Sequence, residues 1–114
     1  MNYQIIVTNI FQKEFKNLYK KYHSLKEDLK KVKTLLFENP EIGDSLGGNF
    51  RKIRMAITSK NKGKSGGARI ITYNVFVDEN NKKIYLLTIY DKGDYDSISI
   101  NELNKIKKDC EIEE

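Results

Sequence analysis

Basic side chains gather in the middle of the sequence without any acidic neighbour. Residues 45–77 contain no Asp or Glu, and the seven bases among them are Arg51, Lys52, Arg54, Lys60, Lys62, Lys64 and Arg69. Residues 91–114, by contrast, hold eight acids and four bases, although the whole chain has a net charge of +5. A cationic surface without counter-charges attracts phosphates, because each contact releases condensed counterions. We therefore expect this block to bind nucleic acid.

Arginine, lysine and tyrosine side chains can together cleave RNA without a metal ion. Attack by an RNA 2′-hydroxyl on its own phosphate needs a group that favours loss of the hydroxyl proton, positive charge around the phosphate, and a donor for the leaving 5′-oxygen. Arg69 is the first candidate for the charge, because a guanidinium matches phosphate oxygens and stays protonated. Lys62 and Lys64 precede it on a Gly- and Ser-rich loop, where ammonium groups can hold the RNA backbone or transfer a proton.

Hydrophobic periodicity predicts the elements that position these residues. The expected elements are a strand over 3–8, helices over 9–22 and 24–38, strands over 52–57, 68–77 and 83–90, and a helix over 99–109. Asn9 is expected to cap the first helix, and Ser24 and Ser99 each open a capping box with a Glu three residues later. The segment EIGDSLGGN, after Pro40, is predicted to be a turn-rich connector.

One predicted strand has a basic face. Lys52 and Arg54 alternate with Ile53 and Met55, so one face of this strand is apolar and the other is cationic. Tyr73 follows Arg69 at an even spacing and shares its face, which makes Tyr73 either a platform for a base or part of ordinary packing.

The order of elements predicts an α+β fold in a single domain over residues 1–114. We expect a small twisted antiparallel sheet, with the N-terminal α-hairpin packed on one face, a short C-terminal helix, and the other face partly open. Cys110 is the only cysteine, so neither a disulfide within the chain nor a thiolate cluster for zinc is expected. The chain shows no signal peptide and no apolar run of membrane-spanning length, which favours the cytoplasm. No metal and no cofactor are expected.

Three segments of the sequence carry a family resemblance. They are RKIRMAI, KGKSGGARIITY and IYLLTIYDKGDYD, within residues 51–96, and they resemble the RelE/ParE superfamily of type II toxins, closest to its HigB branch. The resemblance covers the central sheet, whereas the flanking helical regions agree only in order and length. It implies a RelE-like fold and a metal-independent endoribonuclease that cuts mRNA in the ribosomal decoding site. It also implies a cognate antitoxin that holds the toxin inactive.

The resemblance places two further residues at the site. Tyr90 would be a stacking or proton-transfer group, and Lys92 would stabilise the leaving group. After Lys92 the chain departs from the family pattern, so the general acid stays open and Tyr95 is a second candidate. The predicted catalytic residues are Arg69, Lys64, Lys92 and Tyr90. The predicted RNA-binding residues are Lys52, Arg54, Lys60, Lys62, Tyr73 and Tyr95.

Two other functions fit the same sequence. A ParE-like toxin shares the expected fold but inhibits DNA gyrase, and a gyrase inhibitor has no need of the predicted catalytic group. A non-catalytic RNA-binding module is also compatible, because a basic sheet between helices suits double-stranded RNA. His23, the only histidine, lies between the two predicted helices and is interpreted as a surface or capping residue rather than a general base.

Overall fold

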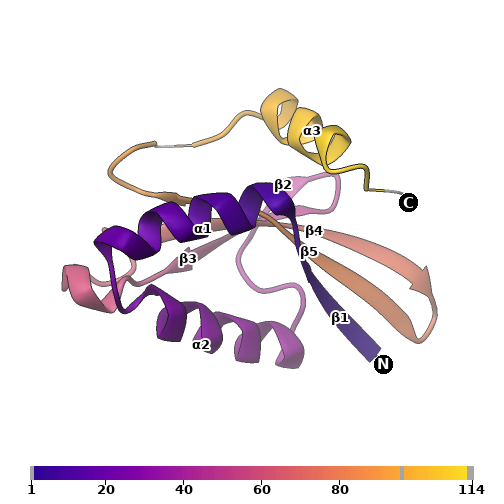
Figure 1. Ribbon diagram of the computed structural model, residues 1–114. Coiled ribbons are helices and arrows are strands. Elements are labelled where there is room, and N and C mark those ends of the chain that lie inside the picture. Colours follow the sequence, from indigo (N-terminus) through magenta and orange to yellow (C-terminus); the bar gives the residue numbers. More distant parts are fainter. Residues whose placement is uncertain (1, 96, 113–114) are drawn as a thin grey trace.

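A five-stranded sheet with helices against both faces organises the computed structural model, which describes residues 2–95 and 97–112 (Figure 1). The strands are β1 (Asn2–Val7), β2 (Asp44–Gly47), β3 (Phe50–Met55), β4 (Ala68–Asp78) and β5 (Asn81–Asp91). The helices are α1 (Asn9–Lys21), α2 (Leu25–Glu38) and α3 (Ile100–Asp109), with a short 3-10 helix, η1 (Thr58–Lys60), after β3. The predicted α+β class, with its N-terminal helical pair and C-terminal helix, is confirmed.

The strand order is β1-β5-β4-β3-β2. The predicted antiparallel meander is confirmed in β3, β4 and β5, whereas β1 pairs with β5 in parallel. The short strand β2 lies within the segment that we predicted to be a connector, and it pairs with β3 through Asp44, Ser45 and Gly47. Positive φ angles at Gly47, Gly48 and Asn49 turn the chain back onto β3 within a few residues. Periodicity misses such a strand because four residues hold too little alternation.

The first core lies between the sheet and the helical pair. Phe11 from α1 and Leu25 and Leu36 from α2 are buried against Ile70 and Ile84 of the sheet. Burying aliphatic and aromatic side chains of this size stabilises a fold by roughly 1.5–3 kcal/mol each, before the entropy of ordering is subtracted. The apolar residues of the predicted α-hairpin are therefore the ones that pack against the sheet.

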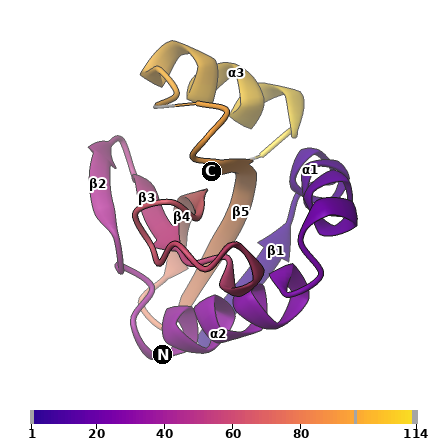
Figure 2. The same ribbon diagram turned by 90° about the vertical axis from the view of Figure 1, so that its left-hand side faces the viewer.

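Helix α3 packs on the opposite face of the sheet (Figure 2). Its Leu103 is fully buried. It covers Phe50, Tyr73 and Leu87, so this face is closed over its middle. The same face continues past α3 to Arg54, which is exposed at the end of β3. The predicted open part of the sheet is thus confined to one end.

Side-chain caps fix the starts of two helices, α1 and α3. The hydroxyl of Thr8, and not the predicted Asn9, accepts the α1 cap bond from Phe11 N at 3.0 Å, and it also donates to Leu87 O at 2.9 Å. Ser24 precedes α2, but its hydroxyl donates to Asp28 and makes no cap bond. The predicted cap at Ser99 is confirmed, since its hydroxyl accepts from Glu102 N.

Glu14 of α1 protects the edge of β5 beyond the end of β1. Its carboxylate oxygen Oε1 accepts from Thr88 Oγ1 at 2.6 Å and from Ile89 N at 3.2 Å. Burial raises the pKa of Glu14, and these two hydrogen bonds oppose the shift only in part. The C-terminal end of β5 is therefore held by α1.

Within residues 2–95 and 97–112, no group of three His, Cys, Asp or Glu side chains is arranged to hold a metal ion. Among the same residues, every helix is too short or too polar to cross a membrane.

Candidate nucleic-acid interface

Arg54, Arg69 and Tyr90 form a row across three adjacent strands. In the sheet register Arg54 pairs with Arg69, and Arg69 pairs with Tyr90. Directly paired residues point to the same face, with Cβ atoms about 4.5–5.5 Å apart. The row therefore places two guanidinium-bearing residues and a phenol side by side on one face, with Arg54 exposed and Arg69 and Tyr90 buried.

Arg69 is the most buried cation of this row, at 4% exposure. Its Nη1 donates to Lys64 O at 2.8 Å and to Ala68 O at 3.0 Å, and its Nη2 makes a longer bond of 3.4 Å to Ser65 O. Burial and the neighbouring charge of Arg54 both lower the pKa of Arg69, but a guanidinium starts so high that it stays charged. The predicted catalytic arginine thus holds the loop that precedes it.

Tyr90 is 3% exposed, and its hydroxyl finds no hydrogen-bond partner among the described residues. Burial raises the pKa of Tyr90, and the positive charge of Arg69 only partly offsets this. Tyr90 is therefore a protonated phenol at neutral pH, which can donate a proton or a hydrogen bond.

Tyr95 covers Tyr90 from the turn that follows β5. The two rings meet edge to face with centroids 5.6 Å apart, and Tyr95 itself is 58% exposed. The turn is held to β5 by backbone bonds from Asp94 N and Tyr95 N to Asp91 O. Lys92 lies in this turn, where its backbone N donates to Gly67 O at 3.0 Å. Tyr95 is thus brought against Tyr90, while Lys92 joins the turn to Gly67.

The segment 61–67, which we name the glycine loop, carries Lys62 and Lys64 with exposed side chains. Gly67 passes so close to β3 that a Cβ at this position would overlap the Met55 carbonyl oxygen. The loop therefore needs glycine where it enters β4, and it presents both lysines to solvent beside the row.

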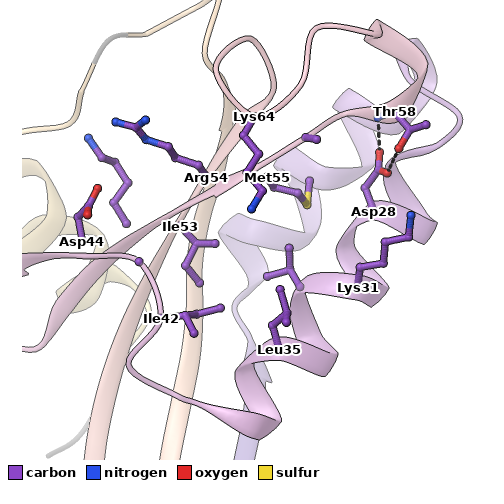
Figure 3. Close-up of a pocket in the computed structure, with 14 residues that line it drawn as sticks. Asp28, Lys31, Leu35, Ile42, Asp44, Ile53, Arg54, Met55, Thr58 and Lys64 are labelled. Atoms are coloured by element: carbon purple, nitrogen blue, oxygen red, sulfur yellow. Dashed lines mark hydrogen bonds between the residues drawn. The ribbon is translucent and has the colours of Figure 1, made fainter.

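A groove of about 720 Å³ runs between α2 and the outer edge of β3. Figure 3 shows Arg54 and Lys64 at one end of the groove, with Lys31 and Leu35 on α2. The four bases that line it are Lys31, Lys52, Arg54 and Lys64, against the two acids Asp28 and Asp44. The lining therefore has an excess of bases over acids, and the carboxylate of Asp28 accepts hydrogen bonds from Thr58.

Lys60 stands apart from the other predicted RNA-binding residues. Its ammonium group forms an ion pair with Asp91 at 2.6 Å and donates to Gly66 O at 2.9 Å. The hydroxyl of Tyr22 donates to the other carboxylate oxygen of Asp91 at 2.8 Å. Lys60 is thus engaged inside the protein, at the base of the glycine loop.

Tyr73 lies in the core under α3. Its ring packs on Phe50 with centroids 4.8 Å apart, and the ammonium group of Lys107 lies 4.5 Å from its centroid. Of the two interpretations of Tyr73, the structure places it in packing rather than on an open platform. His23 is exposed, with its ring edge against Tyr19.

Sequence reasoning missed the acids that anchor the site. Asp28 accepts from Thr58 N, Thr58 Oγ1 and Ser24 Oγ, which fixes η1 to α2. Its signal in the sequence is its place in the apolar stripe of the helix, one residue before Leu29. Asp91 leaves no comparable signal, because Lys60 and Tyr22 are distant along the chain.

No model of a known protein family matches this sequence.

Proposed function

We propose that this protein is a metal-independent endoribonuclease that cuts mRNA on the ribosome, as the toxin of a type II toxin–antitoxin pair. The observation that carries the proposal is the row of Arg54, Arg69 and Tyr90 beside the cationic glycine loop. Positive charge and a neutral phenol at one end of a sheet are what the chemistry of an RNA phosphate requires.

The exposed cations are the groups suited to direct contact with RNA. Arg54 and Lys64 share the groove mouth, and Lys62 extends from the same loop. Arg69 acts through its charge and through the loop that it shapes, because both hydrogens of Nη1 are given to loop and strand carbonyls. A fixed charge of this kind stabilises the phosphorane without reorganising when the reaction occurs.

In this proposal the 2′-hydroxyl loses its proton to water, because the neighbouring positive charge stabilises the alkoxide. The leaving 5′-oxygen takes its proton from a residue at the end of β5. Tyr90 keeps its proton at neutral pH and is the candidate donor to the leaving 5′-oxygen. Tyr95 is the second candidate, and its exposed ring can stack on a base. Lys64, from the glycine loop, and Lys92, from the turn after β5, supply the ammonium groups for the phosphate in this proposal.

A non-catalytic RNA-binding module is the second candidate function. It is favoured by the burial of the Tyr90 hydroxyl and by the engagement of Arg69 with loop carbonyls. The two functions differ in their demands: binding needs only the exposed cations, whereas cleavage also needs Tyr90 or Tyr95 to reach the phosphate.

The proposal includes a cytoplasmic site of action and a cognate antitoxin protein. If an adjacent reading frame encodes a small protein that co-purifies with this chain and suppresses its toxicity, the toxin assignment gains direct support. If no neighbouring product binds it, the toxin assignment loses its basis.

Controlled expression in bacterial cells, with the 5′ ends of transcripts mapped, tests the function. We expect growth arrest and new transcript ends within translated regions. DNA damage without new ends would point instead to gyrase inhibition, and growth arrest with neither would favour the binding module. A variant with Lys62→Glu and Lys64→Glu should restore growth, and its matched control is Lys16→Glu with Lys20→Glu on the exposed side of α1.

A further inference from the structure

Asp91 lies where three parts of the chain meet. It ends β5 and is nearly buried, and its carboxylate contacts η1, the end of α1 and the turn after β5. Oδ1 accepts from Lys60 Nζ at 2.6 Å and from Gly93 N at 2.9 Å. Oδ2 accepts from the Tyr22 hydroxyl at 2.8 Å. Three donors from different segments therefore converge on one carboxylate.

Lys60 extends this cluster to the glycine loop. Its ammonium group donates to Gly66 O as well as to Asp91, which closes the segment from the end of η1 to the start of β4 into a ring. The side chains of Lys60 and Asp91 are only 14% and 7% exposed. Water and salt screen such a pair much less than a pair on the surface.

Asp91 also holds the turn that carries Lys92 and Tyr95. Gly93 N binds its carboxylate, while Asp94 N and Tyr95 N bind its carbonyl oxygen. The Lys92 backbone N then donates to Gly67 O, which joins this turn to the glycine loop. The two segments that flank the row of Arg54, Arg69 and Tyr90 are thus tied to the same residue.

The glycine loop is polar and glycine-rich, and residues 61–65 are exposed, so it buries little apolar surface. Its shape therefore depends on hydrogen bonds. Besides the bond from Lys60, it is held by Arg69, which donates to Lys64 O and Ser65 O, and by Lys92 N, which donates to Gly67 O. Burial disfavours ionisation of Asp91, but hydrogen bonds from Lys60, Gly93 N and Tyr22 outweigh it and lower its pKa.

We propose that Asp91 is a positioning residue for the reaction on RNA. Through Lys60 and Gly66 O it fixes the position of the glycine loop. Through Gly93 N it fixes the position of the turn that carries Lys92 and Tyr95. This inference rests on the proposed ribonuclease function. Lys60, in this scheme, acts on the loop from inside the protein and does not contact RNA.

The test uses the full chain with Lys60→Met, Asp91→Asn and Lys60→Arg. The controls are Asp94→Asn, which removes the same charge from an exposed position of the same turn, and Lys105→Met on the exposed side of α3. Amide hydrogen exchange of residues 61–67, followed by NMR, reports on the loop without any reference to activity. Cleavage of ribosome-bound mRNA gives kcat and KM separately.

We expect Lys60→Met and Asp91→Asn to speed exchange in the glycine loop by about tenfold or more, because a hydrogen bond from a charged donor contributes more than an ordinary one. Their kcat should fall by about tenfold or more, as for misplaced catalytic groups, with KM changed much less because the exposed cations remain. Lys60→Arg keeps the charge and the donors and should recover part of both. Both controls should match the wild type.

Unchanged loop exchange in Lys60→Met and Asp91→Asn would overturn the inference, whatever their activity. Faster exchange with an unchanged kcat would also overturn it, because the loop would then need no fixed position. A wild-type chain that cuts no RNA would contradict the proposed function, and the positioning role along with it. Thermal melts identify the variants that fold. If Lys60→Met does not fold, loop exchange and kcat in Asp91→Asn and Lys60→Arg test the inference.

Discussion

Replacing Arg69 with Ala should cost both stability and activity, and the two losses can be separated. The guanidinium makes two short hydrogen bonds, to Lys64 O and Ala68 O, and one longer bond to Ser65 O. A hydrogen bond from a charged donor contributes about 1.5–3 kcal/mol when its partners are shielded from water. The Lys64 carbonyl lies in the exposed glycine loop and can bind water instead, so we take the lower end for each short bond.

Two short bonds then give a loss of about 3 kcal/mol in the free energy of unfolding, with little from the longer bond. For a domain of this size, each kcal/mol lowers Tm by about 4 °C, so Arg69→Ala should melt about 12 °C below the wild type. Arg69→Lys retains the charge but loses the planar fork, and it should lose about half as much.

Single-turnover cleavage of ribosome-bound mRNA, measured well below both melting temperatures, then isolates the chemical effect. Loss of a transition-state charge lowers the rate by about 100- to 1000-fold in comparable cases. If Arg69→Ala melts within about 2 °C of the wild type, half the shift of a single kcal/mol, the contacts with loop carbonyls contribute nothing and our interpretation of Arg69 is wrong. If the folded variant cuts within about tenfold of the wild-type rate, well short of the expected loss, its charge is not needed for catalysis.

The double variant Lys62→Glu and Lys64→Glu should lose RNA binding while its Tm stays within a few degrees of the wild type, because exposed loop substitutions usually change stability by less than about 0.5 kcal/mol. Filter binding measures the affinity for RNA and thermal melts measure the Tm. An unfolded variant would show that these lysines are structural. Changing Lys52 and Arg54 to Ala should make the slope of log affinity against log salt shallower by about 1.4 for single-stranded RNA, as expected for two lost phosphate contacts, and an unaltered slope would place them outside the interface. In the wild type, burial raises the folded pKa of Glu14 above its unfolded value. The stability that this carboxyl group contributes is therefore present at low pH and lost as pH rises through the folded pKa. Glu14→Gln has no carboxyl group to ionise and escapes this loss. The variant should therefore gain stability relative to the wild type as pH rises above about 4.3, the unfolded pKa of a Glu. Urea unfolding measures the gap in stability, and a gap that narrows as pH rises would contradict the shift.

The elements of the fold could be predicted because each carries its own periodicity. The two N-terminal helices, the meander and α3 all bury the faces that their apolar spacing marks. The cap of α1 moved from Asn9 to Thr8 because the Thr8 hydroxyl also donates to Leu87 O, a partner 79 positions away. Contacts at that distance leave no trace in a local pattern.

Within the site, the sequence predicts only which residues share a face of a strand, because strand alternation determines this. Even spacing placed Lys52 and Arg54 on one face, and pairing then brought Arg54 beside Arg69. Alternation does not say which part of a face a helix covers, so it could not decide between packing and stacking for Tyr73. The contacts of Arg69 with the glycine loop depend on the folded path of that loop, which composition does not determine.

The most direct test of the central claim is cleavage of ribosome-bound mRNA that carries a single 2′-deoxy nucleotide at the mapped cut site. We expect the purified protein to cut the all-RNA message and to leave a 2′,3′-cyclic phosphate or the 3′-phosphate formed from it. The 2′-deoxy message should stay intact at that position, because the attacking hydroxyl is missing. Equal cutting of both messages, or no cutting of either, would contradict a ribonuclease that acts through the RNA 2′-hydroxyl.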